Sequence, residues 1–346
     1  MSDSSVFIIA EAGSNWRMGN KARDLNMAKA LIDVASECKC DAIKFQTYKP
    51  ETTYVPNAGE SDYLSDSGIK ESITNIFQDL SMPYEMIPEI ADYCNIKKIE
   101  FMSTPFSISD SKAVDPYVLR HKIASFEINH SRLIEFLAST KKPLILSTGA
   151  STLEEIEWAI NHFNKNGGKD ISLLHTISSY PAPLSSLNLQ IIHELKKFFN
   201  VTIGFSDHSR DPIIGPVTAV AMGAKIIEKH FTINKKLKGP DHKFALDPNE
   251  LKMMIRQIRQ AEKSLGEGKK QVLKDEKELR EFAVRSIQAI KEIKKGEKFQ
   301  EGENMEILRS GNKTRGSDAR FLMKINGKRS IRSIKLGEGI RLKDVI

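Results

Sequence analysis

Short apolar runs alternate with longer amphipathic segments over the first 265 residues of the chain. Each run has four to seven residues and is rich in β-branched or aromatic side chains, which is typical of parallel strands covered on both faces. Most of the segments between them carry apolar residues at helical spacing, so the pattern predicts strands alternating with helices. The eight predicted strands are Val6–Ala10, Ala42–Phe45, Ile99–Ser103, Val118–Ala124, Leu144–Ser147, Ile171–Leu174, Val201–Phe205 and Lys225–Glu228.

Two of the intervening segments show where a helix begins. Asp24 is the predicted N-cap of one helix, whereas Ser151 and Thr152 precede a second that ends near Gly167 and Gly168. The predicted buried faces are Leu25, Ala28, Leu31, Ile32 and Ala35 in the first helix, and Ile156, Ala159, Ile160 and Phe163 in the second.

Eight strands with intervening helices predict an α/β fold, a (β/α)8 TIM barrel. Parallel strands need crossover connections, and these place the helices outside the barrel. An open doubly wound sheet is the alternative, but no G-x-G-x-x-G follows the first predicted strand. The connection Tyr48–Pro83 is too long for an ordinary strand-to-helix loop, so we expect it to fold over the catalytic end of the barrel.

A smaller β-rich domain is predicted after the barrel. The charged segment 266–285 is expected to be a linker that is partly helical. Beyond it, glycines separate short strand-like pieces. These pieces are Ser286–Ile290, Met305–Leu308, Lys328–Ile334 and Gly339–Leu342. The expected organisation is therefore a barrel over residues 1–265, a linker over 266–285 and a small domain over 286–346.

Charge distinguishes this C-terminal piece from the barrel. The whole chain has a formal net charge of +7, and residues 286–346 contain 15 Lys and Arg against 8 Asp and Glu, so the remainder is balanced. A basic surface attracts any polyanion or phosphorylated substrate. Phe299 and Phe321 are the only aromatic residues of the segment, which argues against a single-strand nucleic-acid binder. We expect no nucleic-acid partner.

Membrane and secretory features are absent from the sequence pattern. No apolar run approaches the roughly 18–20 residues of a membrane-spanning helix, and Met1–Ala10 lacks the basic start of a secretory signal. The three cysteines, Cys38, Cys40 and Cys94, cannot form a disulfide framework and fit a reducing compartment. We therefore expect a cytoplasmic protein with no membrane partner.

Candidate chemistry lies where the predicted strands end, because reactive groups of such barrels gather at the carboxyl ends of the strands. A charged lysine there is costly unless an anion meets it, so Lys44 and Lys122 predict a phosphate or carboxylate pocket. The alternative is that one or both lysines form structural ion pairs with Glu11 or Glu127. Hydroxyl groups expected to assist are those of Thr104, Ser125, Ser147 and Ser206.

Two histidines end adjacent predicted strands. Neutral imidazole is a common ligand of divalent metals, so His208 and His230 are candidate ligands that would leave positions open for activation of a carbonyl. Two hydrogen-bonded structural histidines are the alternative. Glu11, Glu127 and Glu228 are candidates for acid–base chemistry. The alternative for Glu228 is that it only orients Lys229 or a histidine.

Taken together, these strand ends resemble the sialic acid (nonulosonic acid) synthase family. The resemblance covers nearly the whole chain, with the motifs in the family's order. The tail resembles the family's antifreeze-like (SAF) domain through Lys294-Lys295-Gly296-Glu297 and Leu308-Arg309-Ser310-Gly311. The matching stretches of the barrel are Ile8-Ile9-Ala10-Glu11-Ala12-Gly13, Ile43-Lys44-Phe45-Gln46-Thr47, Ser103-Thr104-Pro105-Phe106, Lys122-Ile123-Ala124-Ser125-Phe126-Glu127, Leu146-Ser147-Thr148-Gly149, Ser206-Asp207-His208 and Glu228-Lys229-His230-Phe231.

The resemblance implies that phosphoenolpyruvate condenses with the open-chain aldehyde of an N-acetylmannosamine-type sugar, giving a nine-carbon 2-keto acid and phosphate. It implies a divalent metal, usually Mn2+ in the family with Mg2+ or Co2+ as alternatives, held by His208 and His230. It also implies a homodimer in which the SAF domain caps the partner's barrel. The implied site residues are Glu11, Glu127 and Glu228 for catalysis; Lys44, Thr104, Lys122, Ser125, Ser147 and Ser206 for phosphoenolpyruvate; and Gln46, Tyr180, Asp241, Phe282 and Arg309 for the sugar.

Departures from the family's usual motifs leave the acceptor sugar open. Trp16 stands where many members have histidine, and Ser178 where sialic acid synthases often have asparagine. The stretch Ala124-Ser125-Phe126-Glu127 resembles pseudaminic acid synthases, whereas Gly239-Pro240-Asp241 resembles sialic acid synthases. A pseudaminic or legionaminic acid synthase acting on a diacetamido-dideoxy hexose is therefore the alternative. A metal-dependent hydrolase on the same barrel and a nucleic-acid-binding protein are more distant alternatives.

Overall fold

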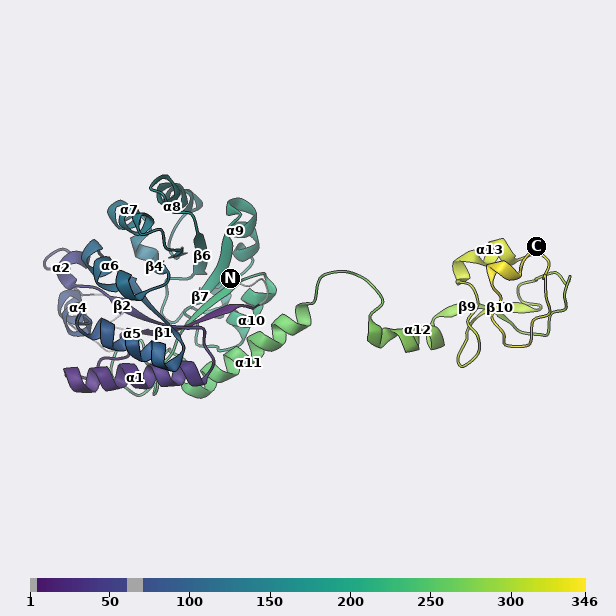
Figure 1. Ribbon diagram of the computed structural model, residues 1–346, viewed down its shortest axis with the longest axis horizontal. Helices are drawn as coiled ribbons and strands as arrows, with labels where there is room; N and C mark the ends of the chain where they lie inside the picture. The colour runs from purple at the N-terminus through teal and green to yellow at the C-terminus, as the bar shows by residue number, and fades with distance from the viewer. Residues whose placement is uncertain (1–4, 61–70) are drawn as a thin grey trace. The chain divides into compact units, whose positions relative to one another are not determined.

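The computed structural model describes residues 5–60 and 71–346 (Figure 1). The chain divides into two compact units, Met1–Gly266 and Glu267–Ile346. Within the described ranges, no helix is long and apolar enough to cross a membrane.

The first unit is built on eight parallel strands in the order β3-β2-β1-β8-β7-β6-β5-β4. The two ends of this sheet, β3 and β4, lie next to each other and complete the ring. The predicted (β/α)8 barrel is therefore confirmed, and the open doubly wound alternative is wrong. The strands are β1 (Phe7–Gly13), β2 (Ala42–Thr47), β3 (Glu100–Pro105), β4 (His121–Ile123), β5 (Leu144–Ser147), β6 (Ile171–Thr176), β7 (Thr202–Asp207) and β8 (Ile226–His230).

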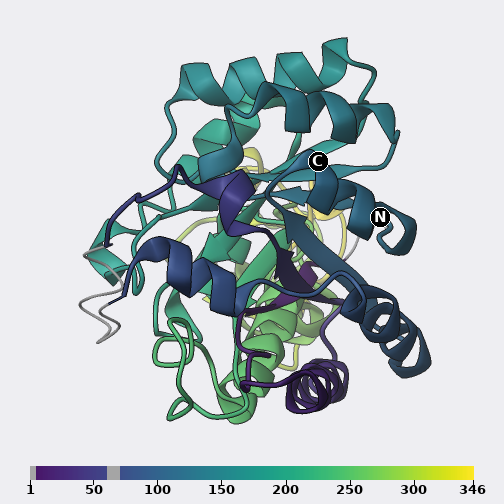
Figure 2. The same ribbon diagram turned by 90° about the vertical axis from the view of Figure 1, so that its left-hand side faces the viewer.

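Helices surround the strands of this unit (Figure 2). Their apolar faces and the outward-facing strand residues form the main core, which is typical of this architecture. The helices are α1 (Lys21–Glu37), α2 (Pro50–Thr53), α4 (Ile73–Leu80), α5 (Met86–Lys97), α6 (Ile108–Val114), α7 (Ser131–Ser139), α8 (Leu153–Lys165), α9 (Ile191–Phe199), α10 (Ile214–Ala221) and α11 (Pro248–Leu265), with single 3-10 turns at η1 (Asp115–Tyr117), η2 (Ser125–Glu127) and η3 (Leu184–Ser186).

A second, separate apolar cluster fills the barrel interior. It contains one side chain from each of six strands, all buried, and Phe7 packs against it. Side chains two positions apart share a face of a strand, so the next inward residues lie one layer closer to the carboxyl end. The cluster consists of Ile9, Ala42, Met102, Ile145, Leu174 and Ile226, and we call it the apolar layer.

Of the two predicted helix starts, the one at Thr152 is confirmed and the one at Asp24 is wrong. Asn20, not Asp24, is the N-cap of α1, and its side chain accepts from the Arg23 N–H. Asp24 lies in the first turn, where it accepts from the N–H of Gly19 and forms an ion pair of 2.7 Å with Arg17, so its carboxylate orders the preceding turn instead. Thr152 is the N-cap of α8, as predicted.

The long connection after β2 contains α2 and α4, and its residues 61–70 lie outside the described ranges. The Tyr48 ring lies 4.6 Å from Phe77 of α4 and 5.3 Å from Phe106, which follows β3. The Ser81 hydroxyl donates to the Tyr48 carbonyl. These contacts hold the described parts of the connection beside the carboxyl ends of β2 and β3.

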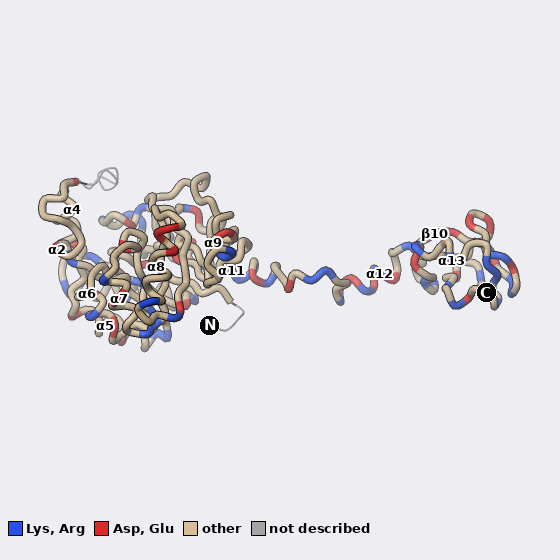
Figure 3. The backbone as a smooth tube through the Cα atoms, turned by 90° about the horizontal axis from the view of Figure 1, so that it is seen from above, with Lys and Arg blue, Asp and Glu red and all other residues tan. Residues whose placement is uncertain are grey.

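The second unit contains the antiparallel pair β9 (Arg285–Ala289) and β10 (Met305–Arg309), with α12 (Lys277–Ala283), α13 (Leu322–Ile325) and 3-10 turns η4 (Lys274–Glu276), η5 (Ala319–Phe321) and η6 (Leu342–Asp344). Acidic residues are interspersed with Lys and Arg along it (Figure 3). Its small core consists of Ile287, Ala289, Ile293, Phe299, Met305, Ile325, Ile334 and Ile340.

Two strands predicted in this unit are wrong. Lys328–Ile334 and Gly339–Leu342 form only isolated bridges, such as Ile293 with Ile334. The backbone itself packs closely here, because a Cβ at Gly316 would lie 2.0 Å from the Ile287 carbonyl oxygen. Turns and loops joined by single bridges therefore replace regular ladders.

The capping box of α8 provides a test of local stability. The Thr152 hydroxyl accepts from the Glu155 N–H, and the Glu155 carboxylate accepts from the Thr152 N–H. We expect Thr152→Ala to lower the free energy of unfolding of the first unit by about 1 kcal/mol, because one end of the box is lost. Thr152→Ser keeps the hydroxyl and should unfold at nearly the wild-type urea concentration. Equal losses for both variants would contradict the capping role.

Candidate active site

A polar layer lies directly above the apolar layer of the barrel. Glu11, Lys44, Thr104, Ser147 and Glu228 each stand two residues after a member of the apolar layer on the same strand, so they face the same interior. All five are buried. The predicted residues of β1, β2, β3, β5 and β8 therefore come together at one level of the barrel.

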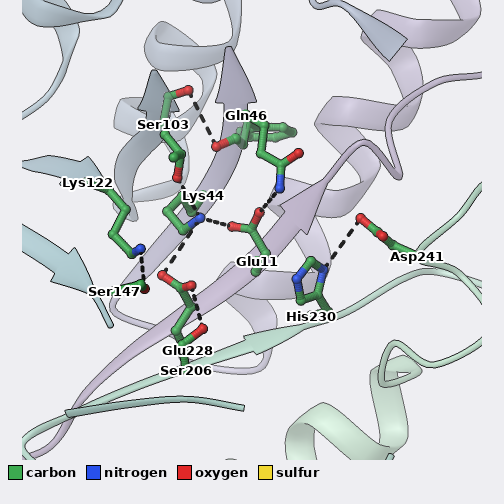
Figure 4. A network of polar contacts seen from close by, with 12 residues as sticks. Glu11, Lys44, Gln46, Ser103, Lys122, Ser147, Ser206, Glu228, His230 and Asp241 are labelled. Carbon is green, nitrogen blue, oxygen red and sulfur yellow. Dashed lines mark hydrogen bonds and ion pairs between the residues drawn. The ribbon is translucent and has the colours of Figure 1, made fainter. Parts of the chain in front are cut away.

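Lys44 lies at the centre of a charged network in this layer (Figure 4). Its ammonium group is 2.6 Å from Glu11 Oε2 and 3.7 Å from Glu228 Oε2, and it donates to Thr104 Oγ1 at 2.8 Å. Gln46 Nε2 donates to Glu11 Oε1 at 3.3 Å. The ion-pair alternative for Lys44 is therefore confirmed with Glu11 as the partner.

Lys122 is buried in a different way. Its ammonium group donates to Ser147 Oγ at 2.6 Å and to the Ile123 carbonyl at 2.9 Å, which are both neutral acceptors. Among the described residues no carboxylate lies within ion-pair distance of it, so the ion-pair alternative fails for this lysine. Burial lowers the pKa of Lys122 to about 8, against the attraction of Glu228 and other carboxylates.

The pKa values of Glu11 and Glu228, the two carboxyl groups of the layer, are shifted in opposite directions. Burial raises the pKa of Glu11, although Lys44 opposes the shift. The pKa of Glu228 is lowered, because attraction by Lys44 and Lys122 and the hydrogen bond from Ser206 outweigh the burial that opposes them. Ser206 Oγ donates to Glu228 Oε1 at 2.9 Å. Two neighbouring carboxyl groups whose pKa values are shifted in opposite directions are suited to opposite roles in proton transfer.

A small cradle lies between the ends of β4, β5 and β6. Ser125 Oγ accepts from the Gly149 N–H at 3.0 Å. A Cβ at Gly149 would lie 2.3 Å from Ser178 Oγ and 2.9 Å from Ser125 Oγ, so only glycine leaves this space open. Ser178 Oγ and Glu127 Oε2 are buried and have no hydrogen-bond partner in the described part of the chain. Burial raises the pKa of Glu127 to about 7.

The two histidines lie together at the ends of β7 and β8, with ring centroids 5.6 Å apart. The Tyr180 ring stacks on the His208 ring with their centroids 4.1 Å apart, and the centroids of Phe244 and His230 are 5.1 Å apart. Asp241 Oδ2 is 3.6 Å from His230 Nδ1. Burial lowers the pKa of both histidines, to about 4 for His208, so both rings are neutral at pH 7.

These histidines fit a metal. Nδ1 of His208 lies 2.8 Å from the Ile177 carbonyl and must donate to it, which leaves Nε2 with the lone pair that a metal requires. Nδ1 of His230 is buried without a hydrogen-bond partner. Within residues 5–60 and 71–346 no group of three or more His, Cys, Asp or Glu is arranged as a metal site. Two imidazoles would thus leave the other positions to water and substrate.

The structure also corrects or completes other expectations. Glu228 faces the interior while Lys229 pairs with Asp207 on the opposite face, so Glu228 does not orient Lys229.

Phe282 and Arg309 belong to the second unit, where the Gly311 N–H donates to the Phe282 carbonyl and keeps the two positions close. Their role in sugar binding stays a prediction.

Sequence reasoning missed Phe244 and the Gly149 cradle. Phe244 lies in the irregular segment after β8 and contacts both His230 and Tyr180, a placement that no periodic pattern indicates. The glycine of the Ser147-Thr148-Gly149 stretch was visible in the sequence, but its role depends on two hydroxyl groups from elsewhere in the chain. Ser125 lies in η2, and Ser178 follows β6.

Comparison with known proteins assigns the chain to a family. The model of the NeuB family matches residues 31–270. The N,N'-diacetyllegionaminic acid synthase of Campylobacter jejuni is 39% identical over 340 residues, covering 97% of this chain and 99% of the relative. The pseudaminic acid synthase of the same organism is 38% identical over 349 residues, covering 99% of this chain and 97% of the relative.

A solved structure agrees with these relatives. The crystal structure of an N-acetylneuraminic acid (sialic acid) synthetase from Leptospira borgpetersenii, in complex with citrate, is 34% identical to this chain with a TM-score of 0.70. The match covers 81% of this chain and 91% of that one. The chain belongs to the NeuB family and is a nonulosonic acid synthase, an enzyme that condenses phosphoenolpyruvate with an amino sugar.

Proposed function

We propose that the enzyme joins phosphoenolpyruvate to N-acetylmannosamine or a close relative, giving a sialic-acid-like nine-carbon 2-keto acid and inorganic phosphate. A diacetamido-dideoxy hexose is the alternative acceptor. The observation that carries the proposal is the presence of two lysine ammonium groups in the buried polar layer, with Lys44 3.7 Å from Glu228 and Lys122 2.6 Å from Ser147. The rings of His208 and His230, 5.6 Å apart, follow at the ends of β7 and β8. Two cations beside a pair of imidazoles suit an anionic donor next to a carbonyl acceptor.

Phosphoenolpyruvate would bind to the cationic part of the polar layer. Among the described residues Lys122 contacts neutral acceptors alone, so its charge would be available to an anion. Lys44 is shared with Glu11 and would supply the remaining positive charge. The hydroxyls of Thr104, Ser125, Ser147 and Ser206 can complete the hydrogen bonds to phosphate and carboxylate oxygens.

The carboxyl groups would handle the protons. C3 of phosphoenolpyruvate bonds to the aldehyde carbon, whose oxygen takes up a proton, and a cationic centre develops at C2. Water adds there and loses a proton, which leaves a hydroxyl group on C2. The bond between C2 and the phosphate ester oxygen then breaks as that hydroxyl loses its proton, giving the 2-keto group and phosphate. Glu127, whose buried Oε2 has no hydrogen-bond partner among the described residues, would stabilise the cationic centre and accept the proton of water. Glu11, whose pKa is raised by burial, would deliver a proton to the aldehyde oxygen, and Glu228 would assist.

A divalent metal, Mn2+ or alternatively Mg2+ or Co2+, would be held by His208 and His230. When bound, it would supply Lewis-acid polarisation of the aldehyde carbonyl. The neutral rings and the fixed tautomer of His208 support this assignment. Tyr180 and Phe244 enclose the imidazoles on the sides and would exclude water from them.

The sugar would lie above the phosphoenolpyruvate, in contact with Gln46, Tyr180 and Asp241. We further propose that the second unit is an SAF domain, and that in a homodimer it caps the partner's barrel with Phe282 and Arg309. The basic balance of residues 286–346 suits a cap over an anionic substrate. The three buried free cysteines are compatible with work in the cytoplasm.

The acceptor can be identified directly. Purified enzyme, phosphoenolpyruvate and Mn2+ are mixed with N-acetylmannosamine or with diacetamido-dideoxy hexoses, and phosphate release and product mass are measured. We expect one acceptor to give sugar-dependent phosphate and a product three carbons longer than the sugar. Folded enzyme that releases no phosphate with any of these sugars would contradict the proposal.

Replacement of Lys122 distinguishes a condensing enzyme from a metal-dependent hydrolase. We expect Lys122→Met to raise the KM for phosphoenolpyruvate at least about 100-fold, since a buried charge that meets the anion is lost. The KM for the sugar should change little. Lys142→Met is the control, because Lys142 pairs with Asp115 in a half-exposed position away from the polar layer. A Lys122→Met enzyme with wild-type use of phosphoenolpyruvate would argue for another anion site.

The pKa of Lys122 also sets a pH dependence. Its pKa near 8 means that the free enzyme loses this charge as the pH rises through about 8. We expect kcat/KM for phosphoenolpyruvate, which reports the free enzyme, to fall about tenfold per pH unit above that value. Lys122→Arg keeps its charge and should shift the fall to higher pH. An unchanged profile in this variant would exclude Lys122 as its origin.

A further inference from the structure

A buried ion pair lies on the outer face of β7 and β8, away from the polar layer. Lys229 Nζ is 2.6 Å from Asp207 Oδ2, and their side chains are 1% and 0% exposed. Helix α10 encloses the pair so tightly that a Cβ at Gly215 would lie 2.7 Å from Asp207 Oδ2. Neither residue faces the barrel interior, so the proposed reaction gives them no direct task.

The strand register places this pair between two pairs of functional residues. Ser206 is paired with Glu228, and Asp207 with Lys229. The first pair faces the interior, where it is hydrogen bonded at 2.9 Å, and the second faces outward. His208 and His230 follow directly and bring their rings within 5.6 Å of each other. The outer ion pair thus links the two strands one residue before the imidazoles.

The same pair fixes the backbone that follows His208. Asp207 Oδ1 accepts from the Ser209 N–H at 2.8 Å, and Lys229 donates to the Ser209 carbonyl at 2.5 Å. Lys229 also donates to the Asp211 carbonyl at 3.2 Å. Both backbone groups of Ser209 are therefore held, which limits rotation of the chain at His208 and keeps its ring within reach of the Ile177 carbonyl.

Stability alone is a poor account of this arrangement. Two apolar side chains of similar volume often stabilise a buried position as well as an ion pair does, because the pair loses its hydration. What apolar groups cannot supply is a set of directed bonds to Ser209 and Asp211. We propose that Asp207 and Lys229 are positioning residues that hold His208 and His230 in the geometry needed to bind the metal. This inference rests on the proposed metal role of the two histidines.

The test uses an isosteric variant and a matched control. The double variant Asp207→Asn/Lys229→Met removes both charges and leaves no buried ion unpaired, so we expect it to fold; Lys229→Met is examined beside it. The control is Glu100→Gln/Arg120→Met. Arg120 and Glu100 form a partly buried pair of 2.7 Å between the starts of β3 and β4, at the other end of the barrel.

The first measurement is made without metal. Nitrogen NMR of histidine-labelled protein reports which ring nitrogen carries the proton. We expect His208 to be protonated on Nδ1 in wild type and in the control, and to become a mixture of tautomers in the Asp207 and Lys229 variants. A wild-type tautomer in a folded double variant would overturn the inference, whatever its melting temperature.

The second measurement is the Kd for Mn2+ from calorimetry. We expect the Asp207 and Lys229 variants to bind Mn2+ 10–100-fold more weakly, as is usual when partners of metal ligands are removed, and phosphoenolpyruvate within about threefold of wild type. The control should bind both as wild type does. A variant Kd for Mn2+ within twofold of wild type would count against the inference. Wild-type enzyme that binds no Mn2+ would instead refute the proposed metal role, and the tautomer measurement would still decide on positioning.

Discussion

The ammonium group of Lys44, held between Glu11 and Glu228, is the interaction on which the rest of the site depends. The apolar layer lies directly beneath it and provides no polar partner for these charges from below. Charges enclosed in this way must be neutralised by one another or by a ligand. Lys44 is neutralised by the carboxylates 2.6 Å and 3.7 Å away. Lys122 has neutral contacts such as Ser147, so a bound ligand would have to neutralise its charge.

The two lysines are not equivalent, because Lys44 contacts carboxylates and Lys122 contacts neutral acceptors. Lys44 serves as an internal counter-ion that fixes the protonation of the carboxyl groups around it. Lys122 rests on a hydroxyl and a backbone carbonyl, which hold its position without cancelling its charge. On the proposed function, an arriving anion would meet a buried cation that no carboxylate of the described residues neutralises, and electrostatic interactions are strong in such surroundings.

The barrel and its inward-facing layer could be predicted from the sequence, because alternation along each strand decides which residues face inward. Lys44 and Gln46, and Glu228 and His230, follow this rule. The ion-pair partner of Lys44 could not be predicted, since Glu11 and Glu127 were equally available and only strand neighbours decide between them. Asp24 was misassigned because a helix start is set by backbone angles, and Asn20 adopts the extended conformation there. The roles of Phe244 and Ser178 depend on loops without any period.

The cradle at Gly149 has a consequence for redesign of the enzyme. Even one added methyl group would occupy the space between Ser125 and Ser178, so the exit of β5 offers no room for alteration. Attempts to broaden the range of sugars accepted would have to change residues elsewhere in the barrel. A library of designed variants would therefore keep Gly149 fixed and vary other positions near the carboxyl ends of the strands.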